Sequence, residues 1–258
     1  MAFNLSIVTI CKNNPKELDI TMQSLAKQSD CIYEHVIIDG GMCKDTCKLV
    51  ENYKHKAGYK VIFISKSDSG IYNAMNKGIR HATGNLISIL NSGDSFFANT
   101  CNIVKRHYNR NHSPFILYGN GRVSNSKGCS RDLFLKCDSP SLLLTRMSLF
   151  HPSVFISKKF YDDFGLYNEK YSIASDFDLL RRMYLGGILF VHINDLLVNM
   201  QDGGVSTLSS KIYEIALQTN IIVNSDKSKI YQLFYIVKEV FIGYLAWLKR
   251  IIKNQCSR

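Results

Sequence analysis

Short apolar runs and longer amphipathic segments alternate along the first hundred residues. The apolar runs are rich in β-branched residues and cover residues 5–10, 35–38, 61–64 and 86–90. Continuous runs of this kind predict strands that are buried on both faces, as in a parallel sheet. The amphipathic segments between them predict helices over residues 15–28, 44–55 and 71–82.

Strand–helix–strand repetition at this spacing predicts right-handed crossovers, and therefore an α/β fold with a doubly wound, mostly parallel sheet. Further strands are predicted at residues 115–118, 154–156, 188–192 and 196–200. From Lys211 the pattern is helical to the end. We therefore expect one domain over residues 1–210 and a C-terminal helical extension over residues 211–258.

Polar residues, acids and glycines follow each of the first four predicted strands. These loops are residues 11–14, 39–41, 67–70 and 91–94. Ligands of doubly wound sheets bind at the carboxyl ends of the strands, so we expect the four loops to share one site.

Two acids in these loops are candidate binding residues, one for a metal ion and one for a nucleotide. Asp94 directly follows a buried strand, where a carboxylate can hold Mg²⁺ or Mn²⁺ beside a diphosphate. It could equally cap a helix that begins near Phe96. Asp39 precedes two glycines that let a ligand approach the backbone, and its carboxylate can accept hydrogen bonds from a base or ribose. Taken alone, Asp39 is also typical of a simple turn.

The helix over residues 71–82 begins with candidate phosphate contacts. Asp68 and the two residues after it open the helix, where backbone N–H groups and the dipole favour anionic oxygens. A plain N-cap explains the same residues. Asn73, Asn76 and Lys77 lie on the first turns, and asparagine is a poor choice for a purely structural helix interior.

Two further candidates lie late in the chain. Asp176 and Asp178 begin a predicted helix, and one carboxylate there could act as a general base toward a substrate hydroxyl. Acids also favour helix starts for electrostatic reasons alone. His151 could contact substrate, although a lone histidine at a strand start is more often structural.

Composition narrows the class of protein. The 258 residues carry a formal net charge of +11, which favours anionic partners such as nucleic acid, an acidic membrane or phosphate-bearing substrates. Dehydrogenases, P-loop kinases and serine hydrolases are disfavoured, because G-x-G-x-x-G, P-loop and G-x-S-x-G motifs are absent. The eight cysteines form no CxxC pair, so we expect reduced thiols.

The N-terminus, MAFNLSIVTICKNN, lacks the basic start and the cleavage site of a signal peptide. No run reaches the ~18 apolar residues that a membrane-spanning helix needs. We expect a cytoplasmic protein, associated with the inner face of the cell membrane.

Several segments together resemble the family 2 glycosyltransferases with the A-type nucleotide-sugar fold, especially enzymes that assemble bacterial O-antigen and exopolysaccharide repeat units. The segments are LSIVTICKNN, HVIIDGG, SDSGIYNAMNKGIRHATGNLISILNSGD, HPSVFI, ASDFDLL and GGVS. The resemblance implies an inverting hexosyltransferase that uses a UDP-sugar donor and Mn²⁺ or Mg²⁺.

The resemblance also implies a role for each matching residue. Asp176 matches the general base that deprotonates the acceptor hydroxyl, which implies inversion at the anomeric carbon, and Ser175 stands where the family often has glutamate. Asp94 corresponds to the last acid of the metal-binding D-x-D motif, although here residues 91–93 contain no other acid. The residues implied in nucleotide-sugar binding are Thr9, Asp39, Asp68, Asn76, Lys77, Ser92 and Gly93, with Asp39 facing the base.

The C-terminal stretch matches the family poorly. Residues 225–258 carry seven Lys or Arg against Asp226 and Glu239, a net charge of +5, and aromatic residues interleave with these charges. Such a helix could lie in a membrane interface and bring the enzyme to an undecaprenyl-pyrophosphate-linked saccharide. It could also pack its aromatic side on the catalytic domain.

Two other functions compete with this interpretation. A sugar nucleotidyltransferase needs a glycine-rich, basic pyrophosphate loop near the N-terminus, which residues 11–14 do not provide. A non-catalytic nucleic-acid-binding protein needs Lys and Arg clustered on one face with stacking aromatics. Basic residues here are scattered until the C-terminus, so we expect no nucleic-acid partner.

Overall fold

The computed structural model describes residues 2–110, 115–124, 133–135, 137–202, 211–225, 227 and 237. Its strands are β1 Leu5–Cys11, β2 Glu34–Asp39, β3 Lys60–Ser65, β4 Leu86–Ile89, β5 Ser95–Phe96, β6 Ile116–Ser124, β7 Leu133–Leu135, β8 Val154–Ser157 and β9 Phe190–Gln201. Its α-helices are α1 Pro15–Ala26, α2 Lys44–Lys54, α3 Ile71–His81, α4 Thr100–Arg110, α5 Lys158–Phe164, α6 Ser175–Leu185 and α7 Ile212–Val223. The short 3₁₀ helices are η1 Ser29–Cys31, η2 Pro140–Leu144 and η3 His151–Ser153. The GGVS loop at 203–206 and most of residues 226–258 lie outside the described residues.

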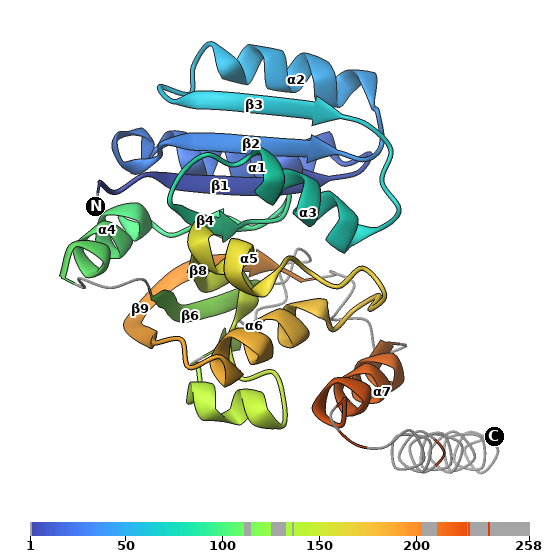
Figure 1. Cartoon of the computed structure of the whole chain (residues 1–258). Helices are drawn as coiled ribbons and strands as arrows, with labels where there is room; N and C mark the ends of the chain where they lie inside the picture. Colours follow the sequence, from blue (N-terminus) through green and yellow to red (C-terminus); the bar gives the residue numbers. More distant parts are fainter. Residues whose placement is uncertain are drawn as a thin grey trace, which may run out of the picture.

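The strands form one sheet in the order β3-β2-β1-β4-β8-β6-β9-β5, with β7 beside β6. The first four strands of this order are parallel, so their carboxyl ends meet at one edge, where the arrowheads lie in Figure 1. β8 runs antiparallel to both β4 and β6, and β6 runs parallel to β9. The expected α/β fold is confirmed, with the continuous parallel order limited to β1–β4.

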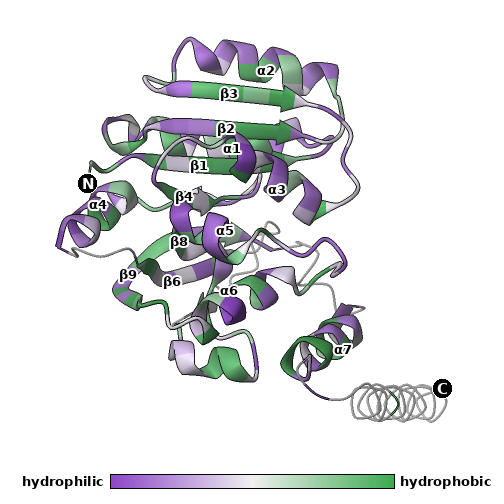
Figure 2. Ribbon diagram, viewed as in Figure 1, coloured by the Kyte–Doolittle hydropathy of each residue, from purple (hydrophilic) through white to green (hydrophobic). Residues whose placement is uncertain are grey.

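Helices cover both faces of the parallel strands. Val36 and Ile38 of β2 belong to the apolar cluster that includes α3, whereas Ile37 belongs to the cluster formed with α1 and α2. α3 packs closely on β1 because Gly78 has no side chain, and a Cβ atom there would lie 2.2 Å from Val8 Cγ1. In Figure 2, hydrophilic and hydrophobic residues alternate along α2 and α3. This packing fixes the start of α3 at the carboxyl edge of the sheet.

Two local features differ from the sequence-based expectation. β9 is a single strand, where the pattern predicted two, and the shift in register falls at residues 119–121 of its partner β6. Asp94 is followed by the short strand β5, and the next helix begins only at Thr100. Asp94 therefore does not cap a helix near Phe96.

Glu34 is a fully buried acid at the start of β2, at the opposite end of that strand from the loop of residues 39–41. Its carboxylate accepts hydrogen bonds from the hydroxyl groups of Ser6 (2.7 Å) and Thr83 (2.8 Å), and from the backbone N–H groups of Thr83 and Gly84. Burial raises the pKa of Glu34, but these hydrogen bonds outweigh burial and hold the pKa below its usual value. The ionised form therefore stabilises the fold above the pKa of the unfolded chain, and this contribution is lost as the pH falls.

We expect Glu34→Gln to lower the free energy of unfolding at pH 7 by roughly 1–3 kcal/mol, because an amide cannot accept all of these bonds. The difference from wild type should shrink at pH 4, which lies below the usual pKa of glutamate, because the unfolded wild-type chain then takes up a proton that the folded carboxylate, with its lowered pKa, resists. Urea denaturation at the two pH values measures it. Glu51→Gln is the control, since Glu51 forms an exposed pair with Lys54. An equal loss at both pH values would contradict this interpretation.

α7 packs against the main body of the protein. Arg181 of α6 donates a hydrogen bond to the backbone oxygen of Val223 (3.2 Å), and Ile222 is buried in the main apolar cluster. The described part of the C-terminal extension is thus joined to α6. Within the described ranges, no helix is both long and apolar enough to cross a membrane.

Candidate active site

The loops that follow β1, β2 and β3 touch one another at the carboxyl edge of the sheet. A Cβ atom on Gly40 would lie 1.6 Å from Asp68 Oδ2, and one on Gly41 would lie 2.3 Å from Asn13 Oδ1. Only glycine allows this approach, which explains the glycine pair after β2. The expectation that these loops come together is therefore met.

Asp39 organises the turn after β2. Its carboxylate accepts hydrogen bonds from the backbone N–H groups of Gly41 (3.0 Å) and Cys43 (3.1 Å), and from the hydroxyl of Ser65 (3.0 Å). The residue is fully buried, so its observed contacts belong to the turn and the neighbouring strand. The turn interpretation thus describes what Asp39 does in this structure.

Thr9 lies inside the sheet next to β2. Its hydroxyl is 2.9 Å from His35 Nε2, and His35 Nδ1 is 3.1 Å from the Tyr53 hydroxyl. Burial lowers the pKa of His35 to about 3, so the imidazole is neutral at physiological pH. Thr9 therefore supports β2 beneath the turn of residues 39–41.

The loop after β4 is held by the start of α1. Asn14 Nδ2 donates to Ser92 Oγ (2.6 Å), and the Thr21 hydroxyl donates to the backbone oxygen of Asp94 (2.7 Å). The N–H of Gly93 donates to the Glu17 carbonyl (3.0 Å), and Gly93 has a φ of +97°, which favours glycine. Asn13 and Asn14 thus link the loop after β4 to the loop after β2.

Asp94 is almost completely buried in this loop, with 5% of its surface exposed. Its Oδ1 accepts a hydrogen bond from the backbone N–H of Gln201 (3.3 Å) at the end of β9. Burial raises the pKa of Asp94 to about 7, although the N–H groups of Gln201 and Asn91 lower it in part. The side-chain oxygen of Asn91 is also buried and has no hydrogen-bond partner. Asp94 and Asn91 are thus oxygen groups with unused acceptor capacity.

The start of α3 lies against the loop after β2. Asp68 Oδ1 accepts from the N–H of Gly70 (3.1 Å), which is the N-cap residue and has no side chain to cap the helix. Gly70 has a φ of +148°, and no atom lies within 4 Å of where its Cβ would be, so there is open space beside the first turn of α3. Lys77 Nζ donates to the backbone oxygen of Ser67 (2.7 Å). The N–H groups of the first turn of α3 and the Lys77 ammonium suit phosphate oxygens.

Asn76 holds two parts of the chain together. Its amide donates to the Tyr167 carbonyl (2.9 Å) and to Glu169 Oε1 (2.8 Å), and its oxygen accepts from the Tyr167 N–H (3.0 Å). It is 2% exposed. With these bonds made inside the protein, Asn76 acts on the site by positioning the loop before α6, a role that the sequence did not predict.

Asp176 lies in the first turn of α6 and is bonded to α3. The Tyr72 hydroxyl is 3.4 Å from Asp176 Oδ1 and 2.7 Å from the Ile173 carbonyl, to which it donates. The N–H of Phe177 also donates to Asp176 Oδ1 (2.8 Å). Asp178 instead pairs with Arg182 at 2.9 Å. The two acids therefore have different partners. Only Asp176 contacts α3, the helix whose first turn holds the candidate phosphate contacts.

An aromatic group that the sequence did not identify surrounds Asp176. Tyr72 and Tyr167 stack with ring centroids 5.5 Å apart, and the Tyr167 hydroxyl is 2.7 Å from His151 Nε2. Burial lowers the pKa of His151, while the negative charge of Asp176 raises it in part. His151 is thus a second titratable group near Asp176.

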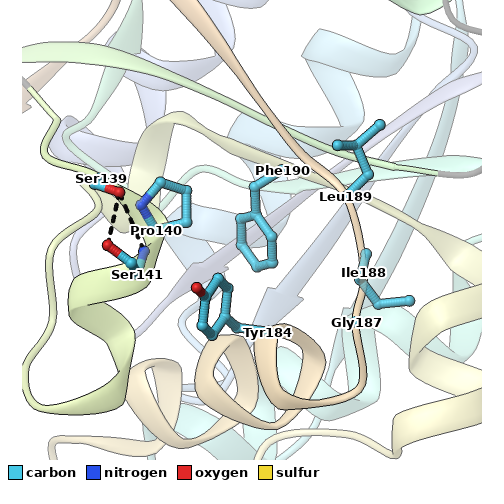
Figure 3. A pocket seen from close by; sticks show the side chains of 8 residues that line it. All are labelled: Ser139, Pro140, Ser141, Tyr184, Gly187, Ile188, Leu189 and Phe190. Atoms are coloured by element: carbon cyan, nitrogen blue, oxygen red, sulfur yellow. Dashed lines mark hydrogen bonds between the residues drawn. The ribbon is translucent and has the colours of Figure 1, made fainter.

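A cavity of about 360 Å³ lies elsewhere on the protein, and Figure 3 shows its lining. Its walls are formed by residues 139–141, 184 and 187–190. Tyr184 is eight residues beyond Asp176 on α6, which corresponds to roughly 12 Å along a helix. This cavity is therefore separate from the candidate active site.

Comparisons with known proteins indicate the class of protein. Residues 6–127 match the model of the family described as Glycosyl transferase family 2. The PGL/p-HBAD biosynthesis glycosyltransferase of Mycobacterium bovis is 27% identical over 183 residues, which cover 69% of each chain.

Solved structures share the fold. The S. aureus TarS fragment 1–349 with UDP-GlcNAc superposes with a TM-score of 0.66 at 17% identity, covering 92% of this chain and 71% of that one. The mannosyltransferase PcManGT of Pyrobaculum calidifontis, with GDP-Man and Mn²⁺, has a TM-score of 0.65 at 14% identity, covering 91% and 68%. The fold and the family match together indicate a glycosyltransferase with the A-type fold. Residues 6–127 carry the family 2 glycosyltransferase domain.

Proposed function

We propose that this enzyme is an inverting glycosyltransferase that moves a hexose from a UDP-sugar to a sugar acceptor carried on a lipid pyrophosphate, in O-antigen or exopolysaccharide assembly. One observation carries the proposal: Tyr72, in the first turn of α3, lies 3.4 Å from Asp176. Because α3 begins at the candidate diphosphate site, the base candidate lies within about one helical turn of where the leaving group would bind.

The donor would bind across the loops after β1, β2 and β3. The uridine would lie beside the turn of residues 39–41, whose backbone Asp39 fixes and Thr9 supports from below. The diphosphate would lie at the start of α3, near Asp68 and Lys77. The Lys77 ammonium makes one of its three possible hydrogen bonds to Ser67 and can reach a phosphate as well. The TarS complex with UDP-GlcNAc supports a UDP-sugar as donor.

The Asp176 carboxylate would act as general base in a single displacement. It takes the proton of the acceptor hydroxyl while the acceptor oxygen forms its bond to the anomeric carbon. The bond from that carbon to the diphosphate oxygen breaks at the same time, and UDP leaves with the electron pair. Attack opposite to the leaving group inverts the configuration.

The loop after β4 would hold a divalent metal ion. Among the described residues, no three His, Cys, Asp or Glu side chains form a metal site, so the protein supplies few ligands. The buried oxygens of Asp94 and Asn91 fit a hard cation such as Mn²⁺ or Mg²⁺, with the diphosphate and Ser92 and Gly93 beside it. When bound, the metal neutralises charge on the departing diphosphate. The PcManGT complex with Mn²⁺ supports this assignment.

The acceptor would reach Asp176 from the membrane. The basic, aromatic composition of residues 225–258 supports peripheral contact with the inner face of the cell membrane, where an undecaprenyl-pyrophosphate-linked saccharide would be presented. Deleting residues 226–258 and measuring co-sedimentation with anionic vesicles tests this part by itself.

A thermal-shift panel of nucleotide sugars tests the donor assignment. UDP-hexoses with Mn²⁺ should raise the melting temperature, and ADP- and CMP-sugars should not, because binding to the native state stabilises it. Transfer assays with the best donor then follow. Stabilisation by none of the UDP-sugars would contradict the proposal.

A further inference from the structure

We propose that Gln218 of α7 is a positioning residue for Asp176, so that the C-terminal helix α7 completes the active site. This inference rests on the proposed role of Asp176 as general base. It concerns the segment just before α6, residues 172–174, which leads directly into the first turn that carries Asp176.

Side chains of α3 and α7 hold this segment by hydrogen bonds to the peptide unit between Ile173 and Ala174, and we call this set of bonds the clamp. On the side of α3, the Tyr72 hydroxyl donates to the Ile173 carbonyl (2.7 Å). On the side of α7, the Gln218 side-chain oxygen accepts from the N–H groups of Ile173 (3.1 Å) and Ala174 (3.2 Å). Ile173 and Ala174 are buried, so water cannot easily replace these partners.

The start of α6 needs this external support. Its N-cap residue is Ala174, which makes no side-chain capping bond, and alanine is among the poorest N-cap residues. The Gln218 oxygen on α7 accepts from the N–H of this N-cap residue, a bond that the Glu or Gln side chain of a capping box makes in other helices. Asp176 lies only two residues beyond Ala174.

Gln218 is itself held in one orientation. Its amide nitrogen donates to Ser172 Oγ (2.6 Å) and to Glu214 Oε1 (3.3 Å). Glu214 in turn pairs with Lys211 (2.5 Å) and accepts from the Ser172 hydroxyl. Both halves of the amide are used, so the side-chain oxygen is directed at the two N–H groups. A general base must lie within hydrogen-bond reach of its proton, and a shift of about 1 Å can lower turnover by roughly 10²-fold.

Gln218→Leu removes the acceptor and should lower kcat by roughly 10-fold or more, because Asp176 loses its fixed position. The KM for the UDP-sugar and the Kd for UDP should stay within about twofold, because the donor loops are not touched. Gln218→Glu keeps an acceptor oxygen and should recover part of the lost kcat. Thr219→Ala, one residue along α7, is the matched control and should behave like wild type.

Asp176→Asn measured in parallel separates this inference from the proposed function. If Asp176→Asn loses turnover but Gln218→Leu keeps kcat within twofold of wild type, the clamp is wrong and the base assignment stands. If Asp176→Asn turns over normally, the base assignment fails and the clamp fails with it. A Gln218→Leu variant that loses UDP affinity as much as kcat would also overturn the inference. Should that variant not fold, Gln218→Met, which keeps the side-chain length but offers no amide oxygen to the two N–H groups, must show the same selective loss of kcat.

Discussion

Asp176→Asn should lower kcat by roughly 10²-fold or more while leaving the affinity for UDP nearly unchanged. Asparagine has the same shape and keeps the Oδ1 acceptor for the Phe177 N–H (2.8 Å) and the Tyr72 hydroxyl (3.4 Å), so the start of α6 is preserved. What it loses is the ability to take a proton from the acceptor hydroxyl. Initial-rate kinetics with saturating UDP-sugar, together with calorimetric UDP binding, separate the two effects.

Asp178→Asn is the matched control for this prediction. Asp178 lies in the same helical turn, but its carboxylate pairs with Arg182 at 2.9 Å. Its loss should reduce stability slightly and leave kcat within a fewfold of wild type. Normal turnover in Asp176→Asn, or an equal loss in both variants, would remove Asp176 from the mechanism.

Asp94→Asn should weaken Mn²⁺-dependent binding of UDP by roughly 10- to 100-fold, the range seen even for residues that support metal ligands. The amide keeps an acceptor for the Gln201 N–H, so the loop stays folded, but the charge that attracts a cation is gone. Asn91→Ala should have a smaller effect, because the buried amide oxygen it removes is neutral. Titration of UDP with and without Mn²⁺ measures both variants. Wild-type protein that binds UDP equally well without metal would contradict the assignment.

Asp94 should also make the stabilisation by Mn²⁺ and UDP depend on pH. Burial raises the pKa of Asp94 to about 7, well above its usual value, so without metal its neutral form stabilises the fold and this contribution is lost as the pH rises through about 7. A bound cation favours the ionised form. Mn²⁺ with UDP should therefore raise the melting temperature more at pH 8 than at pH 6, and Asp94→Asn should remove that difference.

The sequence predicted the parallel half of the sheet, in which β1, β2 and β4 are buried and β3, at the end of the strand order, is only half-buried. Continuous apolar runs are visible without knowledge of their neighbours, which is why β1–β4 and the loops at their ends were found. β5 contains only Ser95 and Phe96 and has no pattern of its own, since it forms only by pairing with β9. The strands β6, β8 and β9 were predicted from residues 115–118, 154–156, 188–192 and 196–200, but their pairing joins segments far apart in the chain and was not predicted.

Some site residues could be predicted from local sequence, and others could not because their partners are distant in the chain. Asp94 and Asp176 were found because each follows a recognisable element and belongs to a family motif. Asn76 was interpreted as a substrate contact because asparagine is rare inside helices, yet its partner Tyr167 lies 91 residues away in the chain. Gln218 reaches residues 44 and 45 positions earlier. No local pattern in the sequence signals such partners.

In the proposed mechanism, the enzyme catalyses a single displacement in which the Asp176 carboxylate deprotonates the acceptor while UDP departs. The most direct measurement is the anomeric configuration of the transferred sugar, read by NMR from the coupling constant of its anomeric proton. An α-linked UDP-hexose should give a β-linked product. An α-linked product would require a different mechanism and would contradict the role assigned to Asp176.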